Sequence, residues 1–448
     1  MYDKENPDVI VVGAGLSGLT AARELGKAGL DALVLEARVR PGGRTGVMEL
    51  DGLIFDIGGE WVDEAHAEIR ALISDLGVGI YPYERRKEDA RWYVHGETTN
   101  EMPFSENDAR IYEQMNEALA ETASTLDPET YWAEAPEHDV SVEAWLRRAG
   151  MGAAGMHTVE TLISTCGSTV PPDRMSFYSY AVKLATRGGP GKGNEYRVVG
   201  GAGSISRAAA EELGDRVRYS SPVTDVIQAG DGVEVQYMTE HGPKSVRSRK
   251  VIMAVPFTVY PTIRFHPEPP AVFRRLMTDS TYGVVRKMAF LFDEAVDSSR
   301  FTLTETPLGY LSAAQDPEVS GGSRGIVSFA GGRPLLADLG LAEKERKQRA
   351  VELLRKLYDV PEPRAVIEKI WAHDYWTRGS YMIVAPGDME SFGEAMGGSF
   401  GNVHLAGAEA VSAAPSFMNS AVKGGLVAAR SVAGDLGVET PTLATAEG

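Results

Sequence analysis

A glycine-rich turn close to the N-terminus constrains the fold of this chain more than any other feature. The β-branched run Val9–Val12 shows no alternation of polar and apolar residues, which is typical of a strand buried on both faces. Gly13, Gly15 and Gly18 follow at once and lead into a helical pattern that stops at Gly29. The first glycine permits a tight turn, the second lets the backbone approach a pyrophosphate, and the third lets the helix pack on the strand. The segment therefore predicts a dinucleotide-binding βαβ unit.

An acidic residue ends the second strand of this unit. Residues 33–35 read as a strand, and Glu36 follows them directly. A carboxylate at that place is suited to accept hydrogen bonds from the ribose hydroxyls of a dinucleotide. Gly42, Gly43 and Arg44 come next, where two glycines and an arginine suit a second approach to phosphate and ring. This second loop favours FAD over NAD as the bound dinucleotide.

Composition and charge narrow the classes of function. The 448 residues predict two or three domains, and the 45 basic and 63 acidic residues give a net charge of −18. Nucleic acids and anionic membranes repel such a chain, so neither is predicted as a partner. The single cysteine, Cys166, excludes an internal disulfide and fits a reducing compartment. With no apolar run near the roughly 20 residues of a membrane span and no ligand spacing among the histidines, we expect a cytoplasmic protein without a metal site.

The rest of the chain alternates helical and strand patterns. Residues 105–165 are helical, and short strands separated by turns follow between 217 and 255. Later come a strand at 284–292, a helix at 342–358, and a strand at 403–406 followed by a helix of small residues at 416–436. The pattern predicts a mixed fold, α/β with α+β character.

In this order, these motifs resemble the flavin amine oxidase family, which includes monoamine, polyamine and putrescine oxidases and L-amino-acid oxidases. The agreement runs over nearly the whole chain and is more specific for fold and cofactor than for substrate. The matching segments are 13–19, 35–38, 42–44, 55–62, 199–201, 221–223, 284–288, 371–381, 405–409 and 417–421.

The resemblance implies a Rossmann-like FAD-binding domain interleaved with a substrate domain made of a sheet and helices. The FAD domain would comprise residues 1–79, 199–273 and 374–436, the substrate-binding domain 80–198 and 274–373, and the tail 437–448. The FAD-binding residues would lie in the glycine turn, at the ribose acid, in the loop after it, beside the adenine and at the last helix. They are Gly13, Ala14, Gly15, Ser17, Gly18, Glu36, Ala37, Arg38, Gly43, Arg44, Gly59, Val223, Gly407, Glu409, Phe417 and Met418.

The resemblance also implies the chemistry: flavin N5 removes a hydride from the carbon beside nitrogen, and O2 reoxidises the flavin. Lys287 matches the lysine that holds a water beside N5. Its strand supports the assignment, because a lysine among apolar strand residues is costly unless it is paired or functional. A snorkelling lysine at a strand end, next to Arg286, is the alternative.

Two aromatic residues, Tyr381 and Phe417, match the walls that flank the amine in front of the flavin in this family. Aromatic faces favour a cation and shape its approach, although single aromatic residues more often belong to a core. Further substrate-binding residues are assigned by position alone: Asn194, Cys166, Tyr178, Tyr180 and Arg324.

The sequence departs from the family at several positions. Ser380 stands where the monoamine oxidases carry the cysteine that bonds the flavin, so we expect noncovalent FAD. Glu60 stands where a neutral residue is common, and Asp63 and Glu64 follow it, which predicts a wider and more acidic pocket. Glu60 and Glu64 are therefore candidate catalytic groups, as a general base or as the site of a cationic amine. Asp63 and Glu64 would equally suit the N-terminus of a helix.

The favoured function is an FAD-dependent oxidase that converts an amine to an imine and O2 to hydrogen peroxide. One alternative is an oxidase of secondary metabolism, as in antibiotic biosynthesis, acting on an amide or N-acyl amine. Its iminium product would be captured within the substrate, as in the lankacidin-type amide oxidase and cyclase. The sequence is also compatible with a flavin desaturase and with a redox-silent FAD-binding module. The partners expected are a small amine or amide and O2, and a homodimer is compatible with the sequence.

Overall fold

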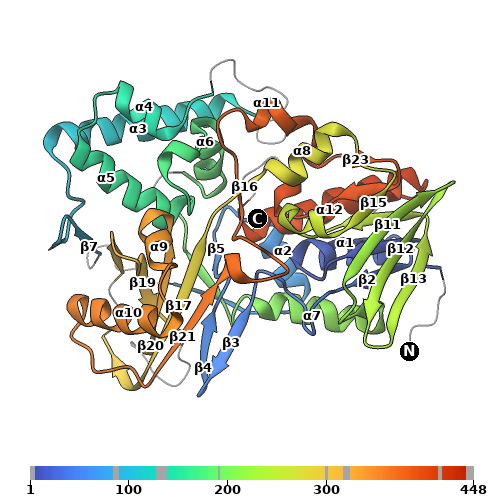
Figure 1. Cartoon of the computed structure of the whole chain (residues 1–448), viewed down its shortest axis with the longest axis horizontal. Coiled ribbons are helices and arrows are strands. Elements are labelled where there is room, and N and C mark those ends of the chain that lie inside the picture. The colour runs from blue at the N-terminus through green and yellow to red at the C-terminus, as the bar shows by residue number, and fades with distance from the viewer. Residues whose placement is uncertain are drawn as a thin grey trace.

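The computed structural model describes residues 6–83, 90–127, 139–189, 192–297, 301–315, 323–411 and 416–439. Two large sheets organise these residues, and segments far apart in the sequence contribute to each of them (Figure 1). The predicted mixed α/β fold class is confirmed. None of the helices in these ranges is long and apolar enough to cross a membrane.

A six-stranded sheet is built around the N-terminal strand β1 (Val9–Val12). β1 pairs in parallel with β2 (Ala32–Leu35) and with β14 (Lys250–Met253). β1 and β2 are buried at every position, as expected for strands covered on both faces. The strand order is β10-β2-β1-β14-β24-β23, with β10 (Val217–Arg218) and β24 (Val403–Leu405) parallel and the edge strand β23 (Ser399–Phe400) antiparallel.

Three helices cover one side of this sheet: α1 (Leu16–Lys27), α7 (Gly203–Leu213) and α12 (Met418–Asp435). α1 and α12 approach each other closely, because a Cβ placed on Gly425 of α12 would collide with the backbone carbonyl of Ser17. The small residues Ala428 and Ala429 continue the same buried contact. The pattern of small residues in the predicted C-terminal helix therefore reflects tight helix packing.

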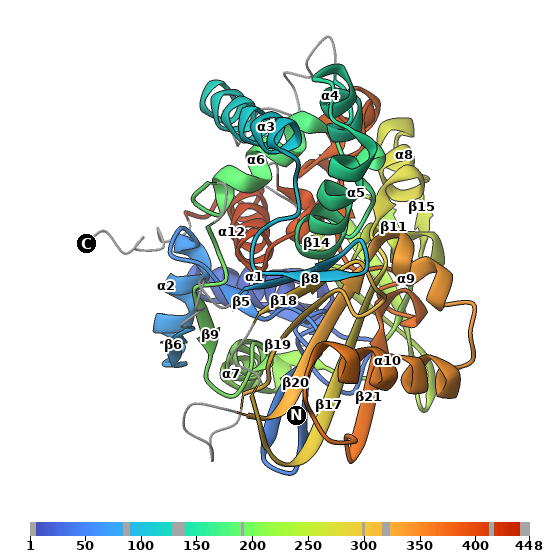
Figure 2. The same ribbon diagram turned by 90° about the vertical axis from the view of Figure 1, so that its left-hand side faces the viewer.

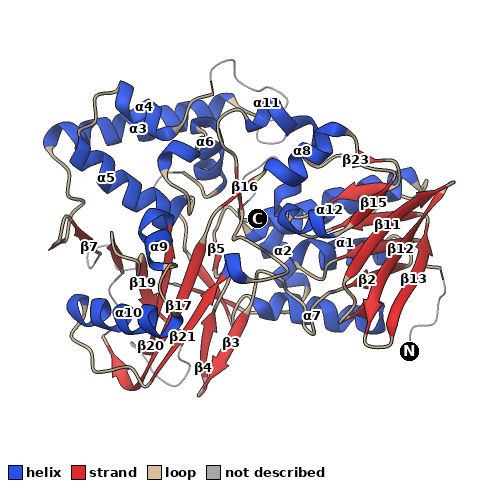
Figure 3. Cartoon of the chain, viewed as in Figure 1, coloured by secondary structure: helices blue, strands red, loops and turns tan. Residues whose placement is uncertain are grey.

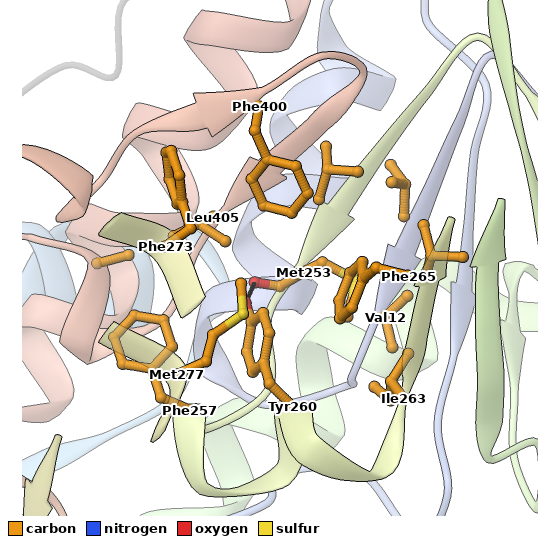
Figure 4. Packing of buried hydrophobic residues seen from close by; sticks show 14 of the residues in the cluster. Val12, Met253, Phe257, Tyr260, Ile263, Phe265, Phe273, Met277, Phe400 and Leu405 are labelled. Carbon is orange, nitrogen blue, oxygen red and sulfur yellow. Dashed lines mark hydrogen bonds between the residues drawn. The ribbon is translucent and has the colours of Figure 1, made fainter. Parts of the chain in front are cut away.

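A second apolar layer covers the other face of the six-stranded sheet. It is formed by a four-stranded sheet, a 3-10 turn and helix α8 (Ala271–Asp279). In Figure 4, the rings of Tyr260, Phe265 and Phe273 converge on Met253 of β14, and the Tyr260 hydroxyl donates a hydrogen bond to the Met253 carbonyl (3.3 Å). The four strands, in sheet order, are β13 (Gly242–Ser248), β12 (Gly232–Thr239), β11 (Val223–Ala229) and β15 (Arg264–His266).

The second large sheet has seven strands and is mostly antiparallel. Its longest strand, β17 (Val285–Val296), separates two apolar clusters. Met288, Phe290 and Phe292 pack against α10 (Glu343–Leu357), whereas Ala289 and Leu291 face the hairpin strand β4 (Leu53–Asp56). The order is β21 (Ala365–Ile370), β17, β20 (Ser323–Gly331), β19 (Tyr310–Ala313), β18 (Thr302–Thr304), β7 (Arg91–Val94) and β8 (Glu97–Thr99), and α9 (Gly332–Asp338) follows β20.

A group of helices lies beyond the second sheet. Figure 3 shows these helices in blue above the red strands of that sheet, and Figure 2 shows the same helices in the turned view. They share one apolar cluster, which includes Ile111, Leu146 and Val159. These helices are α3 (Glu106–Thr125), α4 (Val142–Arg148), α5 (Ala153–Leu162) and α6 (Phe177–Thr186). They confirm the helical pattern predicted for 105–165.

Short elements join the larger parts. The hairpin β3 (Val47–Leu50) with β4 leads into β5 (Trp61–Val62), which pairs with β9 (Tyr196–Val198) and, through it, with β6 (Ile80–Pro82). β16 (Thr281–Tyr282) pairs with β22 (Met382–Ile383), and the remaining helices are α2 (Ala67–Asp75) and α11 (Asp388–Phe392).

The strands of the two large sheets follow the predicted division of the chain. Those of the six-stranded sheet lie within 1–79, 199–273 and 374–436, and those of the seven-stranded sheet within 80–198 and 274–373. The small sheets β5-β9-β6 and β16-β22 draw strands from both sets. The domain division itself stays a prediction, and residues 440–448 of the predicted tail lie outside the described ranges.

A buried ion pair anchors β17 to its helical cover. Arg286 is fully buried, pairs with Asp338 at the end of α9 and lies 3.5 Å from Glu368 of β21. Its second nitrogen donates to the Pro307 carbonyl at 2.7 Å. The side chains of Arg286 and Lys287 thus point to opposite faces of the same strand, and the two cations pair with different carboxylates.

We predict that Asp338→Ala lowers the free energy of unfolding by about 3–5 kcal/mol, because it leaves a buried guanidinium without its nearest carboxylate. Glu234→Ala is the control, since Glu234 pairs with the largely exposed Arg247 and such pairs contribute about 1 kcal/mol or less. Urea unfolding monitored by fluorescence measures both. Equal midpoints for the two variants would contradict the prediction.

Candidate active site

A cavity opens at the carboxyl ends of β1 and β2 and extends to the face of β17 that carries Val285 and Lys287. This is the edge at which parallel α/β sheets bind their ligands. Among its lining residues are Val12, Gly13, Gly15, Ser17, Glu36, Ala37, Arg38, Gly43, Arg44, Gly59, Val223, Val285, Lys287, Phe329, Trp371, Trp376, Ser380, Tyr381, Gly407, Phe417 and Met418. Thirteen of the sixteen predicted cofactor residues are in this lining, and the other three, Ala14, Gly18 and Glu409, lie behind it.

The three glycines of the turn have three different environments. Gly13 has a φ of 104°, and a Cβ there would lie 2.8 Å from the Ala254 carbonyl oxygen. A Cβ on Gly18 would collide with the Gly13 carbonyl, so α1 can pack against the turn only with glycine at this position. A Cβ on Gly15 would have no atom within 4 Å, because Gly15 faces the open cavity. The backbone at Gly15 is therefore accessible to a ligand, and the N-terminus of α1 points its free N–H groups there.

The acid at the end of β2 is held by backbone amides. Glu36 is buried and accepts hydrogen bonds from the N–H of Ala14 (2.7 Å) and the N–H of Arg38 (2.8 Å). Burial raises the pKa of Glu36, and these two hydrogen bonds oppose the rise. Arg38 is fixed in turn by Asp374, at 2.6 and 3.1 Å. The carboxylate is thus oriented at the cavity wall, as a ribose ligand requires.

The second loop is fixed by an ion pair with the C-terminal segment. Arg44 forms a two-pronged pair with Glu409, 2.9 Å in its longer contact, and donates to the Ser380 carbonyl at 3.0 Å. Ser17 accepts a hydrogen bond from the Gly407 N–H at 2.8 Å. Glu409 therefore acts on the cavity through Arg44, and three distant segments meet around it.

Lys287 projects from β17 into the same cavity. Its Nζ donates to the Asp56 carbonyl and to the Glu60 carboxylate, each at 2.8 Å. Glu60 also pairs with the buried Arg197 of β9. Burial raises the pKa of Glu60, but Lys287 and Arg197 outweigh it and hold the pKa below the usual range. Burial and the nearby Glu60 raise the pKa of Asp56 to about 7.

This arrangement defines the character of Glu60. A carboxylate shared by two buried cations stays ionised and is a poor proton acceptor. The candidate role of Glu60 as a general base is therefore not supported, whereas a role in holding Lys287 is. Lys287, Arg197 and Glu60 together carry one positive charge, which the neighbouring Asp56 cancels as the pH rises above its pKa of about 7.

The two predicted aromatic walls, Tyr381 and Phe417, both line the cavity. The centre of the His66 ring lies 5.1 Å from that of the Phe417 ring. Met418 packs closely on Gly59, because a Cβ at Gly59 would lie only 2.9 Å from the Met418 sulfur. Close to both walls, although not among the residues that line the cavity, lies a residue that the sequence did not single out: the Nζ of Lys183 in α6 is 4.7 Å from the Tyr381 ring centre and 5.6 Å from that of Phe417. The sequence gives no sign that this lysine belongs to a site, because it is a single charged residue in a mostly apolar helical segment.

The predicted acidic pocket is not what the structure contains. Glu64 is exposed, accepts a hydrogen bond from the Tyr196 hydroxyl at 2.6 Å and pairs with Arg70. Asp63 is buried, accepts from the Asn194 N–H at 2.6 Å and lies 3.8 Å from Arg187. Each acid of this stretch therefore has a basic partner. Glu64 lies on the surface before α2, and this placement does not support a catalytic role.

The other predicted substrate residues lie outside the described cavity lining. Asn194 holds Asp63 through its backbone, Tyr180 is buried in the helical cluster, and Tyr178 packs against the apolar layer of Figure 4. Arg324 lies on β20, half-buried. Cys166 falls in the turn Ile163–Gly167, and its side chain is outside what the structure describes. Their roles in substrate binding stay predictions.

One group of possible metal ligands lies away from the cavity. His95, His157 and Glu305 place their ligand atoms within 4.8 Å of one another on the surface. Glu305 already accepts hydrogen bonds from His157 (2.6 Å) and from the N–H groups of His95 and Gly96 (3.0 Å each). These contacts link the hairpin that carries His95 to α5 and explain why the three side chains lie together. The expectation of a protein without a metal site stays a prediction.

Comparison with known proteins agrees with this geometry. The sequence model of the family described as "Flavin containing amine oxidoreductase" matches residues 16–433. The chain belongs to this family. It is 28% identical over 461 residues to putrescine oxidase of Kocuria rosea, covering 95% of each chain. It is 25% identical over 451 residues to the probable flavin-containing monoamine oxidase A of Dictyostelium discoideum, covering 95% of this chain and 97% of the relative.

Solved structures of this family superpose closely on the chain. Wild-type putrescine oxidase bound to putrescine has a TM-score of 0.85 at 25% identity, covering 96% of this chain and 99% of that one. Cyclohexylamine oxidase from Brevibacterium oxydans IH-35A has a TM-score of 0.85 at 24% identity with the same coverage. FAD is the cofactor of the family and of this chain, and the accessible backbone at Gly15 and the oriented Glu36 fit it.

The glycine turn supplies a paired test of FAD binding. Gly15→Ala places a methyl group in open space, so the protein should fold normally but lose at least about tenfold in FAD affinity, because the methyl group displaces the pyrophosphate from the backbone. Gly18→Ala forces the helix away from the turn and should lower thermal stability even without FAD. Fluorescence titration with FAD and thermal unfolding of the apoprotein separate the two effects. The reverse pattern would disprove these assignments.

Proposed function

We propose that this chain oxidises an amine at the carbon bonded to nitrogen. Two electrons and two protons leave the C–N unit, giving an imine, and O2 takes them up to give hydrogen peroxide. The observation that carries the proposal is Lys287, a buried cation fixed at the wall of a cavity that two aromatic side chains also line. The similarity to proteins named putrescine oxidase and cyclohexylamine oxidase supports the same reaction class.

Bound FAD supplies the two-electron redox chemistry that amino-acid side chains lack. The chain supplies binding and orientation. The Gly15 backbone and the N-terminus of α1 would receive the pyrophosphate, and Glu36 would accept the ribose hydroxyls. We also propose that the FAD-binding residues form one domain and that the second sheet and its helices form the substrate domain, as the division of the two sheets suggests.

Lys287 has a specific task in this proposal. An ammonium group has three N–H donors, and two of them are used by the Asp56 carbonyl and Glu60. The third is available to a water or to O2 in the cavity. Because Glu60 is shared with Arg197, it does not fully neutralise the Lys287 ammonium, whose positive charge stabilises negative charge that develops as O2 is reduced.

Tyr381 and Phe417 restrict the approach of the substrate. Both side chains line the cavity, and aromatic faces there would position the reacting group by shape and by the ring electrostatics. The wall at Phe417 is supported by His66, whose Nδ1 accepts a hydrogen bond from the Asp63 N–H at 3.0 Å. Burial lowers the pKa of His66, so this support is neutral at physiological pH.

An anaerobic substrate panel tests the reaction class. Alkylamines, arylalkylamines, diamines, amino acids and N-acyl amines are added in turn, and flavin bleaching is recorded. We expect at least one amine-containing class to reduce the flavin and to yield stoichiometric peroxide after air is admitted. Neither putrescine oxidase nor cyclohexylamine oxidase is named for amide oxidation, and a response to N-acyl amines alone would favour the antibiotic-biosynthesis alternative. No bleaching by any class would favour the redox-silent module.

The flavin attachment gives a separate prediction. Ser380 lines the cavity and uses its hydroxyl to donate to the Gly283 carbonyl at 2.8 Å, and a serine offers no thiol for a thioether link. Acid or heat denaturation should therefore release all the yellow colour into the filtrate. Flavin that stays with the precipitated protein would refute noncovalent binding.

The role of Lys287 predicts a split between the two half-reactions. Lys287→Met keeps the length of the side chain but removes its charge and its donors, while the FAD-binding contacts lie elsewhere. Reoxidation by O2 should slow by at least about tenfold, which corresponds to 1.4 kcal/mol, with a smaller loss in reduction by substrate. Stopped-flow spectroscopy measures both halves.

Lys344→Met on the exposed surface of α10 is the matched control, because it makes the same substitution far from the cavity. It should leave both half-reactions unchanged. If Lys287→Met reoxidises like the control, Lys287 is a structural lysine and the proposed task is wrong.

A further inference from the structure

A buried lysine lies beside both aromatic walls, just behind the residues that line the cavity. Lys183 is 5% exposed, and its Nζ lies 4.7 Å from the Tyr381 ring centre and 5.6 Å from that of Phe417. Both distances are within the roughly 6 Å over which a cation interacts with an aromatic face. The same faces would receive the nitrogen of a simple cationic amine. The lysine therefore lies within a few ångströms of the place that such a substrate would take.

The charge of Lys183 differs from that of the other buried cations. In the described part of the chain, each of these has a carboxylate partner: Arg23 with Glu212, Arg197 and Lys287 with Glu60, Arg286 with Asp338, and Arg346 with Glu368. No described residue gives Lys183 a hydrogen bond or an ion pair, so its contacts there are the two rings. A buried cation without an acceptor is costly, so an acceptor oxygen brought by a ligand would stabilise the charged form of Lys183.

The surroundings reinforce this imbalance. Arg187 lies one turn further along α6, and burial together with Arg187 lowers the pKa of Lys183 to about 7. Asp63, the acid beside Arg187, is already engaged by the Asn194 N–H at 2.6 Å and by Arg187 at 3.8 Å. With a pKa of about 7, Lys183 is only partly protonated near neutral pH, and a ligand carboxylate or carbonyl would stabilise its protonated form, which the described residues do not.

Resting on the proposed amine oxidation, we propose that Lys183 determines the substrate class. It binds a carboxylate or carbonyl oxygen that the substrate carries close to its reacting C–N bond, and it excludes amines whose only polar group is an ammonium. An acceptor oxygen gives the lysine the partner that it lacks, whereas a second ammonium between the rings meets a like charge. Amino acids and N-acyl amines share this chemistry.

Three ligands with one phenylethyl skeleton test the proposal: phenethylamine, phenylalanine and N-acetylphenethylamine. The first is a cation without an acceptor oxygen, the second carries a carboxylate, and the third carries a carbonyl. Anaerobic stopped-flow reduction gives the rate constant divided by the dissociation constant for each. We expect the wild type to favour one of the oxygen-bearing ligands over phenethylamine by at least about tenfold, as for a charged hydrogen bond. Whichever ligand is favoured identifies the carboxylate or the carbonyl as the group bound.

Two variants of Lys183 connect this preference to the residue. Lys183→Met has a similar length without charge or donors and should reduce the preference by at least about tenfold. Lys183→Arg keeps a cation and should retain the direction of the preference. Lys344→Met, the exposed control on α10, should behave like the wild type.

A binding measurement keeps the proposal separate from the reaction. The unreactive carboxylate 3-phenylpropanoate is titrated into each holoenzyme, and the flavin difference spectrum gives its dissociation constant. If it binds the wild type and binds Lys183→Met at least about tenfold more weakly, but no amine reduces the flavin, the Lys183 site is correct and amine oxidation is wrong. If amines reduce the flavin, but the ligand order and this dissociation constant are the same in the wild type and Lys183→Met, amine oxidation is correct and the Lys183 proposal is overturned. Absence of 3-phenylpropanoate binding and a preference for phenethylamine in the wild type would also overturn it.

Discussion

The ion cluster around Glu60 is the interaction on which the cavity depends. Lys287 comes from β17, Arg197 from β9 and Glu60 from the turn before β5, so three segments are joined by one carboxylate. Moving these charges out of water costs several kcal/mol for each ion, and a lone cation at this depth would destabilise the fold. Sharing one anion between two cations stabilises both and neutralises them only in part. The same contacts therefore join the seven-stranded sheet to the small sheet β5-β9-β6 and place charge beside the cavity.

Close backbone approaches set the opposite side of the cavity. Gly18 allows α1 to pack on the turn, Gly425 allows α12 to pack on α1, and Gly15 leaves its backbone open to the ligand. Arg44 and Glu409 then tie the second loop to the C-terminal segment. Glycine at these positions serves packing in two cases and ligand access in one, although the three residues look alike in a sequence.

The acids and bases near the substrate side of the cavity are unequally paired. The acids that distinguish this chain from its relatives each have a partner, whereas Lys183 beside the aromatic walls has none among the described residues. The number of acidic residues in a stretch of sequence therefore does not predict the net charge of the active site beside it. In the proposal made above, Lys183, and not the acids, determines which amines the pocket accepts.

Much of the fold and the cofactor site was determined by the sequence itself. The βαβ turn was predictable because strand, glycines, helix and Glu36 are neighbours in the chain, and local spacing there decides the geometry. The opposite faces of Arg286 and Lys287 were predictable because side chains alternate along a strand. What Glu60 and Lys183 do was decided only by tertiary structure. Glu60 meets partners from β9 and β17, and Lys183 meets Tyr381 from the far end of the chain. The effect of a buried charge depends on the neighbours that folding brings to it, and sequence spacing carries no record of those contacts.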